Sequence, residues 1–101
     1  MTIMRDVIIS NQVRLKISEL NLYLTQEFKL SWVAAEARIQ RMKVFVESFR
    51  NEVDYPLCRF IKWRKLGYHC AVFEKSWVFA YELVPEGVIV RDMAHTAVLA
   101  E

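Results

Sequence analysis

Apolar residues recur at helical spacing in two stretches of the N-terminal half. In the first stretch they line one face of a helix predicted from Gln12 to Phe28: Val13, Ile17, Leu20, Leu24 and Phe28. In the second they line one face of a helix predicted from Trp32 to Phe49: Trp32, Ala35, Ile39, Met42, Val46 and Phe49. A helix that is apolar on one side must bury that side, so the pattern predicts a helical hairpin that covers another layer.

Residues that cap helices stand before both stretches. Ser10 and Asn11 precede the first and Ser31 precedes the second, and each has a side-chain oxygen that can accept a hydrogen bond from a free backbone N–H. The preceding residues 5–9 are rich in β-branched side chains, which predicts a short first strand. Pro56 disfavours helical dihedral angles at the residue before it, so the second helix ends ahead of it.

The last third of the chain carries the strand signal. Three runs rich in β-branched and aromatic residues are separated by residues that favour turns: 68–73, 77–83 and 88–95. With the earlier elements they predict an α+β fold, in which a short N-terminal strand and a two-helix hairpin pack on a C-terminal antiparallel β-meander. Residues 1–101 contain no linker or repeat, so we expect a single domain.

The turns decide which side chains share a face of the predicted sheet. A two-residue turn at 74–75 sets His69 opposite Ala80. A two-residue turn at 85–86 sets Ala80 opposite Arg91. The face that meets the helices would then carry this set: Tyr68, Cys70, Val72, Trp77, Phe79, Tyr81, Leu83, Val88 and Val90. The opposite face would carry a mixed set, and we expect any chemistry there: His69, Ala71, Val78, Ala80, Glu82, Ile89, Arg91, Met93 and His95. One extra residue in either turn would invert this assignment.

Composition excludes several classes of protein. The chain is 54% hydrophobic and 13% aromatic, which is too apolar for a disordered protein, and its apolar runs are too short to span a bilayer. Its first residues lack the apolar core of a secretory signal, so we expect a cytoplasmic protein. In that compartment Cys58 and Cys70, twelve positions apart, are expected to be reduced packing residues. No metal-ligand spacing or phosphate loop occurs, and no cofactor is implied.

Four cations fall within seven residues just before the meander: Arg59, Lys62, Arg64 and Lys65. Trp63 stands among them. Cations with an interleaved aromatic residue suit RNA phosphates and bases, so these five are candidate RNA-binding residues. The same charges on an edge strand would serve only to prevent unwanted strand pairing, and both interpretations stay open.

The order of these elements, with a histidine ending the last strand, resembles the RelE/ParE superfamily of bacterial toxins. In that superfamily a short strand leads into two helices, a loop ending near a proline, and a three-stranded meander. The run Trp77-Val78-Phe79-Ala80-Tyr81-Glu82-Leu83 is similar to the superfamily's central strand, and His95 is similar to its terminal histidine. The resemblance covers nearly the whole chain.

The resemblance implies the toxin of a type II toxin–antitoxin system, a class that includes plasmid stabilization proteins. The cognate antitoxin would be the partner, and operator DNA would be contacted only through it. A RelE-like member is an mRNA interferase, a metal-independent endoribonuclease that inhibits growth by cutting messenger RNA on the ribosome. The alternatives are a ParE-like inhibitor of DNA gyrase without catalysis, or a relative that has lost catalysis and only binds its antitoxin.

Cleavage of RNA by its 2′-hydroxyl needs a base, an acid and cations at the phosphate. His95, Arg91 and His69 are the candidate catalytic residues. Two features depart from RelE-like enzymes: Val78 stands where an arginine is common, and residues 96–98 replace basic residues. Both remove positive charge from the expected site. Convergence of the histidine and the cations on one concave pocket would favour an enzyme, whereas a binding protein needs only an exposed face.

Overall fold

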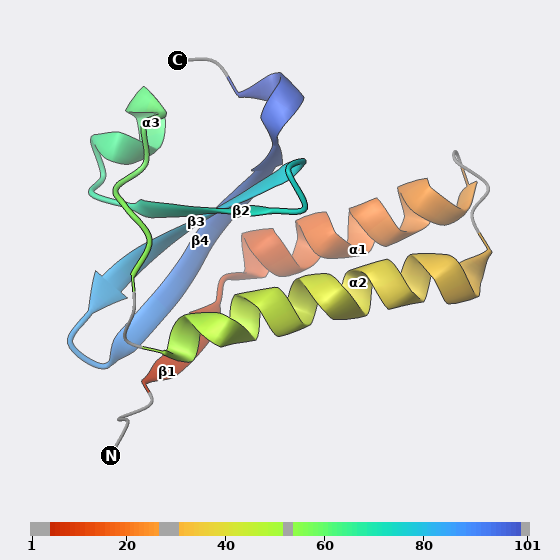
Figure 1. The fold of residues 1–101 in the computed structure, drawn as a ribbon, viewed down its shortest axis with the longest axis horizontal. Helices are drawn as coiled ribbons and strands as arrows, with labels where there is room; N and C mark the ends of the chain where they lie inside the picture. The colour runs from red at the N-terminus through yellow and green to blue at the C-terminus, as the bar shows by residue number, and fades with distance from the viewer. Residues whose placement is uncertain (1–4, 27–30, 52–53, 100–101) are drawn as a thin grey trace.

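The protein folds as one four-stranded sheet with two long helices on one of its faces (Figure 1). We describe it from a computed structural model, which covers residues 5–26, 31–51 and 54–99. Its elements follow in this order: β1 (Asp6–Ile9), α1 (Asn11–Gln26), α2 (Trp32–Glu47), the 3₁₀ turn η1 (Ser48–Arg50), α3 (Ile61–Arg64), β2 (His69–Phe73), β3 (Trp77–Val84), β4 (Gly87–His95) and the 3₁₀ turn η2 (Thr96–Val98). The predicted α+β fold is confirmed.

Hydroxyl side chains begin both long helices, as predicted. Ser10 Oγ accepts a hydrogen bond from the N–H of Val13 at 3.3 Å, and Ser31 Oγ accepts one from Ala34 at 3.1 Å. Both apolar stripes are buried as expected, apart from the first residue of the second stripe. Trp32 is 69% exposed, because α2 begins beyond the edge of the sheet (Figure 1). Phe28, predicted to end the first stripe, lies outside the described residues.

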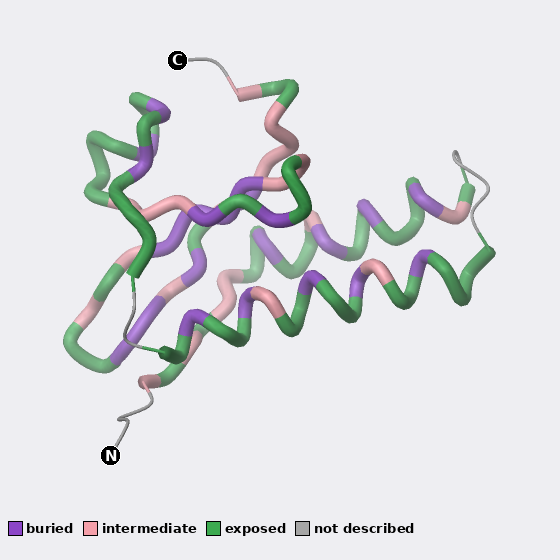
Figure 2. The backbone as a smooth tube through the Cα atoms, in the orientation of Figure 1, coloured by how far each residue is buried: buried purple, intermediate pink, exposed green. Residues whose placement is uncertain are grey.

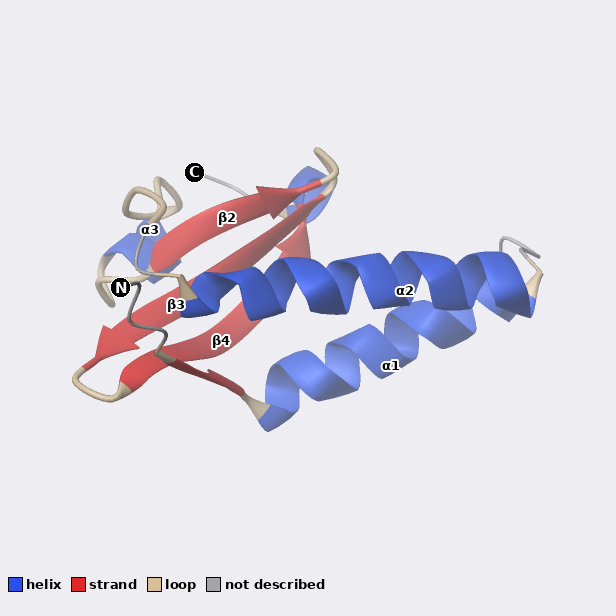
Figure 3. Cartoon of the chain, turned by 60° about the horizontal axis from the view of Figure 1, so that its bottom comes forward, coloured by secondary structure: helices blue, strands red, loops and turns tan. Residues whose placement is uncertain are grey.

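The strands are ordered β1-β4-β3-β2, with β1 parallel to β4 and the other neighbours antiparallel. Helices α1 and α2 lie across one face of this sheet (Figure 3), while α3 and η2 lie beyond the other face (Figure 1). Buried residues follow the inward sides of both helices and the middle of the sheet (Figure 2). The main core therefore lies between helices and sheet, and the α3 side holds a smaller cluster.

The first turn of the meander is one residue longer than predicted. Phe73 pairs with Trp77, which leaves residues 74–76 as a three-residue loop. The first two loop residues have φ angles of 48° and 63°, which curve the chain back within this short connection. His69 consequently pairs with Tyr81, and the predicted pairing with Ala80 is wrong.

The longer turn inverts the two faces of β2. Ala71 and Phe73 belong to the main core beneath the helices, whereas Cys70 packs against the smaller cluster on the α3 side. Val72, which the sequence pattern placed under the helices, is 53% exposed. The side chains alternate as expected, but the assignment of this strand's faces was wrong because one residue shifts them all.

The second turn forms at 85–86 as predicted, but a β-bulge follows it. Ala80 pairs with Asp92, so Arg91 has no partner in the register and its predicted pairing with Ala80 is wrong. Beyond a bulge the alternation of a strand is shifted by one residue. Met93 is therefore fully buried in the main core and does not lie on the mixed face.

Candidate functional site

The basic segment is a loop with a short helix, not an edge strand. α3 forms one helical turn within it, and all four cations of the segment are exposed: Arg59, Lys62, Arg64 and Lys65. Trp63 is only 3% exposed, because its side chain fills the smaller apolar cluster beside Phe60. The ammonium of Lys62 lies 4.8 Å from the centre of the Trp63 ring. The prediction that Trp63 stacks on RNA bases is therefore wrong, whereas the cations lie at the surface.

His95 lies on the helix side of the sheet, contrary to its predicted place on the mixed face. Its ring meets Trp77 edge-on at 5.1 Å between centroids. Nδ1 accepts a hydrogen bond from the N–H of Ala97 at 3.0 Å, so the neutral ring carries its proton on Nε2. The side chain borders an open cavity of about 420 Å³, which Lys16 and Tyr23 of α1 also line.

Arg91 lies on the other face of the sheet. Its guanidinium donates two hydrogen bonds to Oε1 of Glu82, at 3.0 and 2.7 Å, and this carboxylate raises the pKa of Arg91 above its usual value. Glu82 follows Tyr81, whose ring belongs to the main core, so the Arg91–Glu82 pair points away from the helices. The cation is already paired with a carboxylate of its own sheet.

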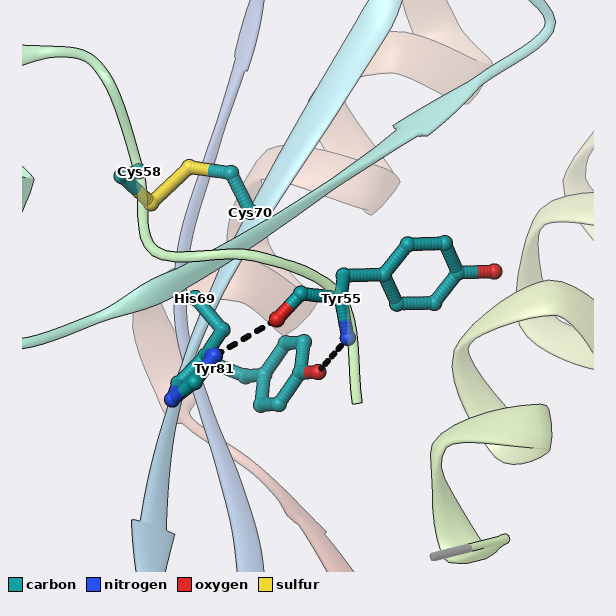
Figure 4. Close-up of a disulfide and its surroundings, with 5 residues drawn as sticks. All are labelled: Tyr55, Cys58, His69, Cys70 and Tyr81. Atoms are coloured by element: carbon teal, nitrogen blue, oxygen red, sulfur yellow. Dashed lines mark hydrogen bonds between the residues drawn. A yellow bond between two sulfur atoms is a disulfide. The ribbon is translucent and has the colours of Figure 1, made fainter. Parts of the chain in front are cut away.

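His69 packs against the edge of the main core, on the helix side and not on the predicted mixed face. Its ring stacks on Tyr81 with 5.4 Å between centroids (Figure 4). The backbone carbonyl of Tyr55 lies 2.6 Å from its Nδ1, so this nitrogen carries a proton and donates it. Both contacts hold His69 in a fixed structural arrangement.

Tyr81 anchors the loop before β2 through a hydrogen-bond network that the sequence pattern did not predict. Its hydroxyl accepts a bond from the N–H of Tyr55 at 2.9 Å and donates one to Asp54 at 3.1 Å. The carboxylate also pairs with Arg5, and the hydrogen bond from this guanidinium lowers the pKa of Asp54. Burial, with the nearby carboxylate, raises the pKa of Tyr81 to about 12. The only signal in the sequence is that a buried tyrosine hydroxyl needs a partner.

Replacement of Tyr81 by Phe should lower the free energy of unfolding by about 1–2 kcal/mol at neutral pH, because the part-buried N–H of Tyr55 loses its acceptor and Asp54, which keeps Arg5, loses a donor. The raised pKa means that the folded state favours the protonated phenol. The stability gained from this protonated hydroxyl is complete below pH 10, and it is lost as the pH rises through about 12. The advantage of the parent over Tyr81→Phe, measured by urea unfolding, should therefore shrink over this range.

The matched control for this substitution is Tyr55→Phe, because Tyr55 joins the network only through its backbone. Its stability should stay within about 0.5 kcal/mol of the parent. Equal losses in the two variants at neutral pH would show that the Tyr81 hydroxyl does not anchor the loop.

The candidate catalytic residues do not gather at one point. His95 lies opposite Trp77 and His69 opposite Tyr81, which is four residues farther along β3. Four residues of an extended strand span about 13 Å. Arg91 lies on the other face. The structure therefore separates the two candidate histidines from each other and from Arg91.

The basic segment borders a groove on the face opposite to α1 and α2. This groove, which we call the α3 groove, has a volume of about 530 Å³, and its lining includes the following residues: Leu57, Arg59, Phe60, Cys70, Val72 and Val78. Val78, which stands where the resemblance expects an arginine, is buried beneath this segment. Among the described residues that line the groove, none is a candidate catalytic residue: His69, His95 and Arg91 all lie elsewhere. It is mainly apolar with a basic rim.

Cys58 and Cys70 form a disulfide in the wall of the α3 groove (Figure 4), so the prediction of reduced cysteines is wrong. The backbone brings them together: the N–H of Cys58 donates to Tyr68 at 2.9 Å, and the N–H of Cys70 donates to Pro56 at 3.2 Å. These bonds set the two Cα atoms 4.8 Å apart, within the range that a disulfide needs. A spacing of twelve residues does not by itself reveal such a juxtaposition.

Strand β2 leaves part of its outer edge available. The segment around Leu57 pairs with its beginning through an isolated bridge at His69. Toward Phe73, no further strand flanks this edge among the residues that the structure describes. An open strand edge can take up an added strand from a partner.

Within the described ranges, no group of three histidine, cysteine, aspartate or glutamate side chains is placed to hold a metal ion. No helix in those ranges has the length and apolar character needed to cross a membrane. When the chain is compared with models of protein families, with curated proteins and with solved structures, nothing matches it.

Proposed function

We propose that this chain is a toxin of the RelE/ParE kind that inhibits its target by binding and not by cutting RNA. The separation of His95, Arg91 and His69 carries this proposal. Transfer of a proton at a scissile phosphate requires the acid and the base within hydrogen-bond reach of the reacting oxygens. His95 and His69 pair with residues four positions apart on β3, about 13 Å along the strand, and Arg91 lies on the other face of the sheet, so the three side chains do not meet that requirement together.

The fold and the surface both support a binding role. The order of one strand, two helices and a meander is the arrangement that the resemblance implies. The helical hairpin projects beyond the sheet (Figure 1), and it exposes large apolar side chains toward its tip: Leu22, Trp32 and Val33. Exposed large apolar side chains are candidates for contact with a protein partner. The proposed target is DNA gyrase in the cytoplasm, with the hairpin as the contacting element.

The antitoxin would bind elsewhere, at the basic segment and the open edge of β2. Exposed cations at Lys62 and Arg64 favour an acidic segment, and the strand edge can pair with it through backbone hydrogen bonds. Operator DNA would then be contacted through the antitoxin. In this proposal the target binds the helical hairpin, and the antitoxin binds the α3 side of the sheet.

Induced expression in a bacterial host tests the proposal when translation and DNA supercoiling are followed separately. We expect plasmid supercoiling to fall before translation slows. The variant His95→Ala should inhibit growth to within about twofold of the parent, whereas loss of a positioned proton donor in an enzyme costs about 10²- to 10⁴-fold. Co-expression of the product of the neighbouring reading frame should relieve the defect.

Two results would contradict the proposal. Translation that stops first, with messenger cleavage abolished in a folded His95→Ala protein, would restore the ribonuclease interpretation. Absence of any growth defect would argue against a toxin altogether.

A further inference from the structure

The segment from Asp54 to Tyr68 is a small lobe with few attachments to the rest of the fold. The middle of the lobe packs in one apolar cluster, whose buried residues in the described part of the chain are Cys58, Phe60, Trp63, Val78 and Ala80. At its beginning, the ring of Tyr55 lies 6.0 Å from that of Phe49 in the main core. The main core, by comparison, contains sixteen buried residues among those that the structure describes. At its beginning the lobe is held by the Asp54 and Tyr55 contacts to Tyr81. At its end it runs directly into β2.

Between these ends, the disulfide is the covalent attachment of the lobe to the sheet. Cys58 is 1% exposed within the lobe, and Cys70 lies in β2 and lines the α3 groove. The disulfide therefore joins the two walls of the groove. It also fixes the position of the exposed cations that follow Cys58 in sequence.

We propose that the Cys58–Cys70 disulfide is a reducible clamp that holds the basic lobe against the sheet, so that the α3 groove is a preformed surface only in the oxidised protein. A low-molecular-weight thiol is the co-reactant. Its thiolate attacks the sulfur of Cys70 from the groove, and the Cys58 sulfur leaves as a thiolate that takes up a proton. A second thiol then attacks the mixed disulfide. Overall, two thiols become one disulfide and the protein gains two thiol groups.

Reduction should loosen the lobe without unfolding the protein. The disulfide closes a loop with a sequence separation of 12, and such a bond limits the conformations open to the enclosed segment. Without it, the lobe is still attached to β2 by the hydrogen bond from Cys70 to Pro56, the bridge of Leu57 with His69 and the small cluster, and these are noncovalent contacts near the surface. Neither cysteine belongs to the main core, so the helices and the sheet keep their packing. Local opening of this kind is typical of regions with few buried contacts.

Limited digestion with trypsin tests the clamp, because the lobe carries four trypsin sites and the helices carry others. The folded protein is compared with and without dithiothreitol, and new thiols are counted by iodoacetamide labelling and mass spectrometry. Reduction should add two labelled cysteines and speed cleavage at 59–65 at least about tenfold. Cleavage after Arg38 and Lys43 in α2 should change less than about twofold over the same treatment.

The double variant Cys58→Ser/Cys70→Ser provides the control for the reagent. It should be cleaved like the reduced parent, and dithiothreitol should not change its pattern. If this variant does not fold, the reduced parent decides the question, with near-ultraviolet circular dichroism as the check on its core.

Equal cleavage of the lobe before and after reduction would overturn the proposal. Faster cleavage throughout the chain would also overturn it, as would two reactive thiols in the untreated protein. None of these measurements depends on the proposed toxin function, so either idea can fail while the other stands.

Discussion

The substitution Gly87→Ala should destabilise the protein by more than about 3 kcal/mol, the size of effect expected where a backbone position admits no side chain. Gly87 begins β4 with a φ angle of 154°, which residues with a side chain rarely adopt. A Cβ atom there would lie 2.2 Å from the carbonyl oxygen and 2.9 Å from the nitrogen of Asp6. These are backbone atoms of β1, so no side chain can swing aside. The parallel pairing of β1 with β4 must break or shift.

The control is Gly67→Ala, at a second glycine with a positive φ angle. Gly67 has a φ angle of 76°, but an added Cβ would meet nothing within 4 Å. This variant should therefore lose only about 1 kcal/mol, from backbone strain alone. Urea unfolding of both variants measures the difference. If Gly87→Ala is no less stable than Gly67→Ala, the described contact between β1 and β4 is incorrect.

Reversal of two charges on α3, Lys62→Glu with Arg64→Glu, should weaken the binding of the neighbouring-gene product by about 10- to 100-fold at low salt. The expected partner segment is acidic, and like charges placed together repel. Because both side chains are exposed, the loss should shrink as salt screens the charges. Titration calorimetry at low and high salt measures both effects.

The matched control carries the same change of charge on the helices. Arg14→Glu with Lys43→Glu alters two exposed cations of α1 and α2, far from α3 in sequence and on the other side of the sheet (Figure 3). It should leave affinity for the proposed antitoxin within about threefold of the parent. A larger loss in the control than in the α3 variant would place the proposed partner on the helical face.

The helices could be predicted closely because their signals are local and repeated. Ser10 and Ser31 cap them. The residues at apolar spacing in α1 and α2 are, apart from Trp32, the residues that the described structure buries. Trp32 was wrongly assigned to the buried stripe because it has the correct helical spacing. It is exposed because α2 begins beyond the edge of the sheet, where no layer covers it. Spacing alone does not indicate where the neighbouring layer ends.

The faces of the sheet could not be predicted to the same extent, since single residues decide them. The loop at 74–76 contains no glycine, and the bulge at Arg91 has no local sequence signal. These two features moved His69 and His95 to the helix side and separated them from Arg91. The network around Tyr81 and the disulfide were missed for a similar reason, because each joins residues that only the folded chain brings together.

The proposed inhibition by binding can be distinguished from RNA cleavage in a purified system that contains both candidate targets. The protein is added to translating ribosomes, where primer extension maps new ends in the messenger, and in parallel to DNA gyrase acting on a relaxed plasmid. We predict no new messenger ends, loss of supercoiling, and the same results for His95→Ala. Discrete messenger cuts that disappear in a folded His95→Ala protein, with gyrase unaffected, would contradict the claim.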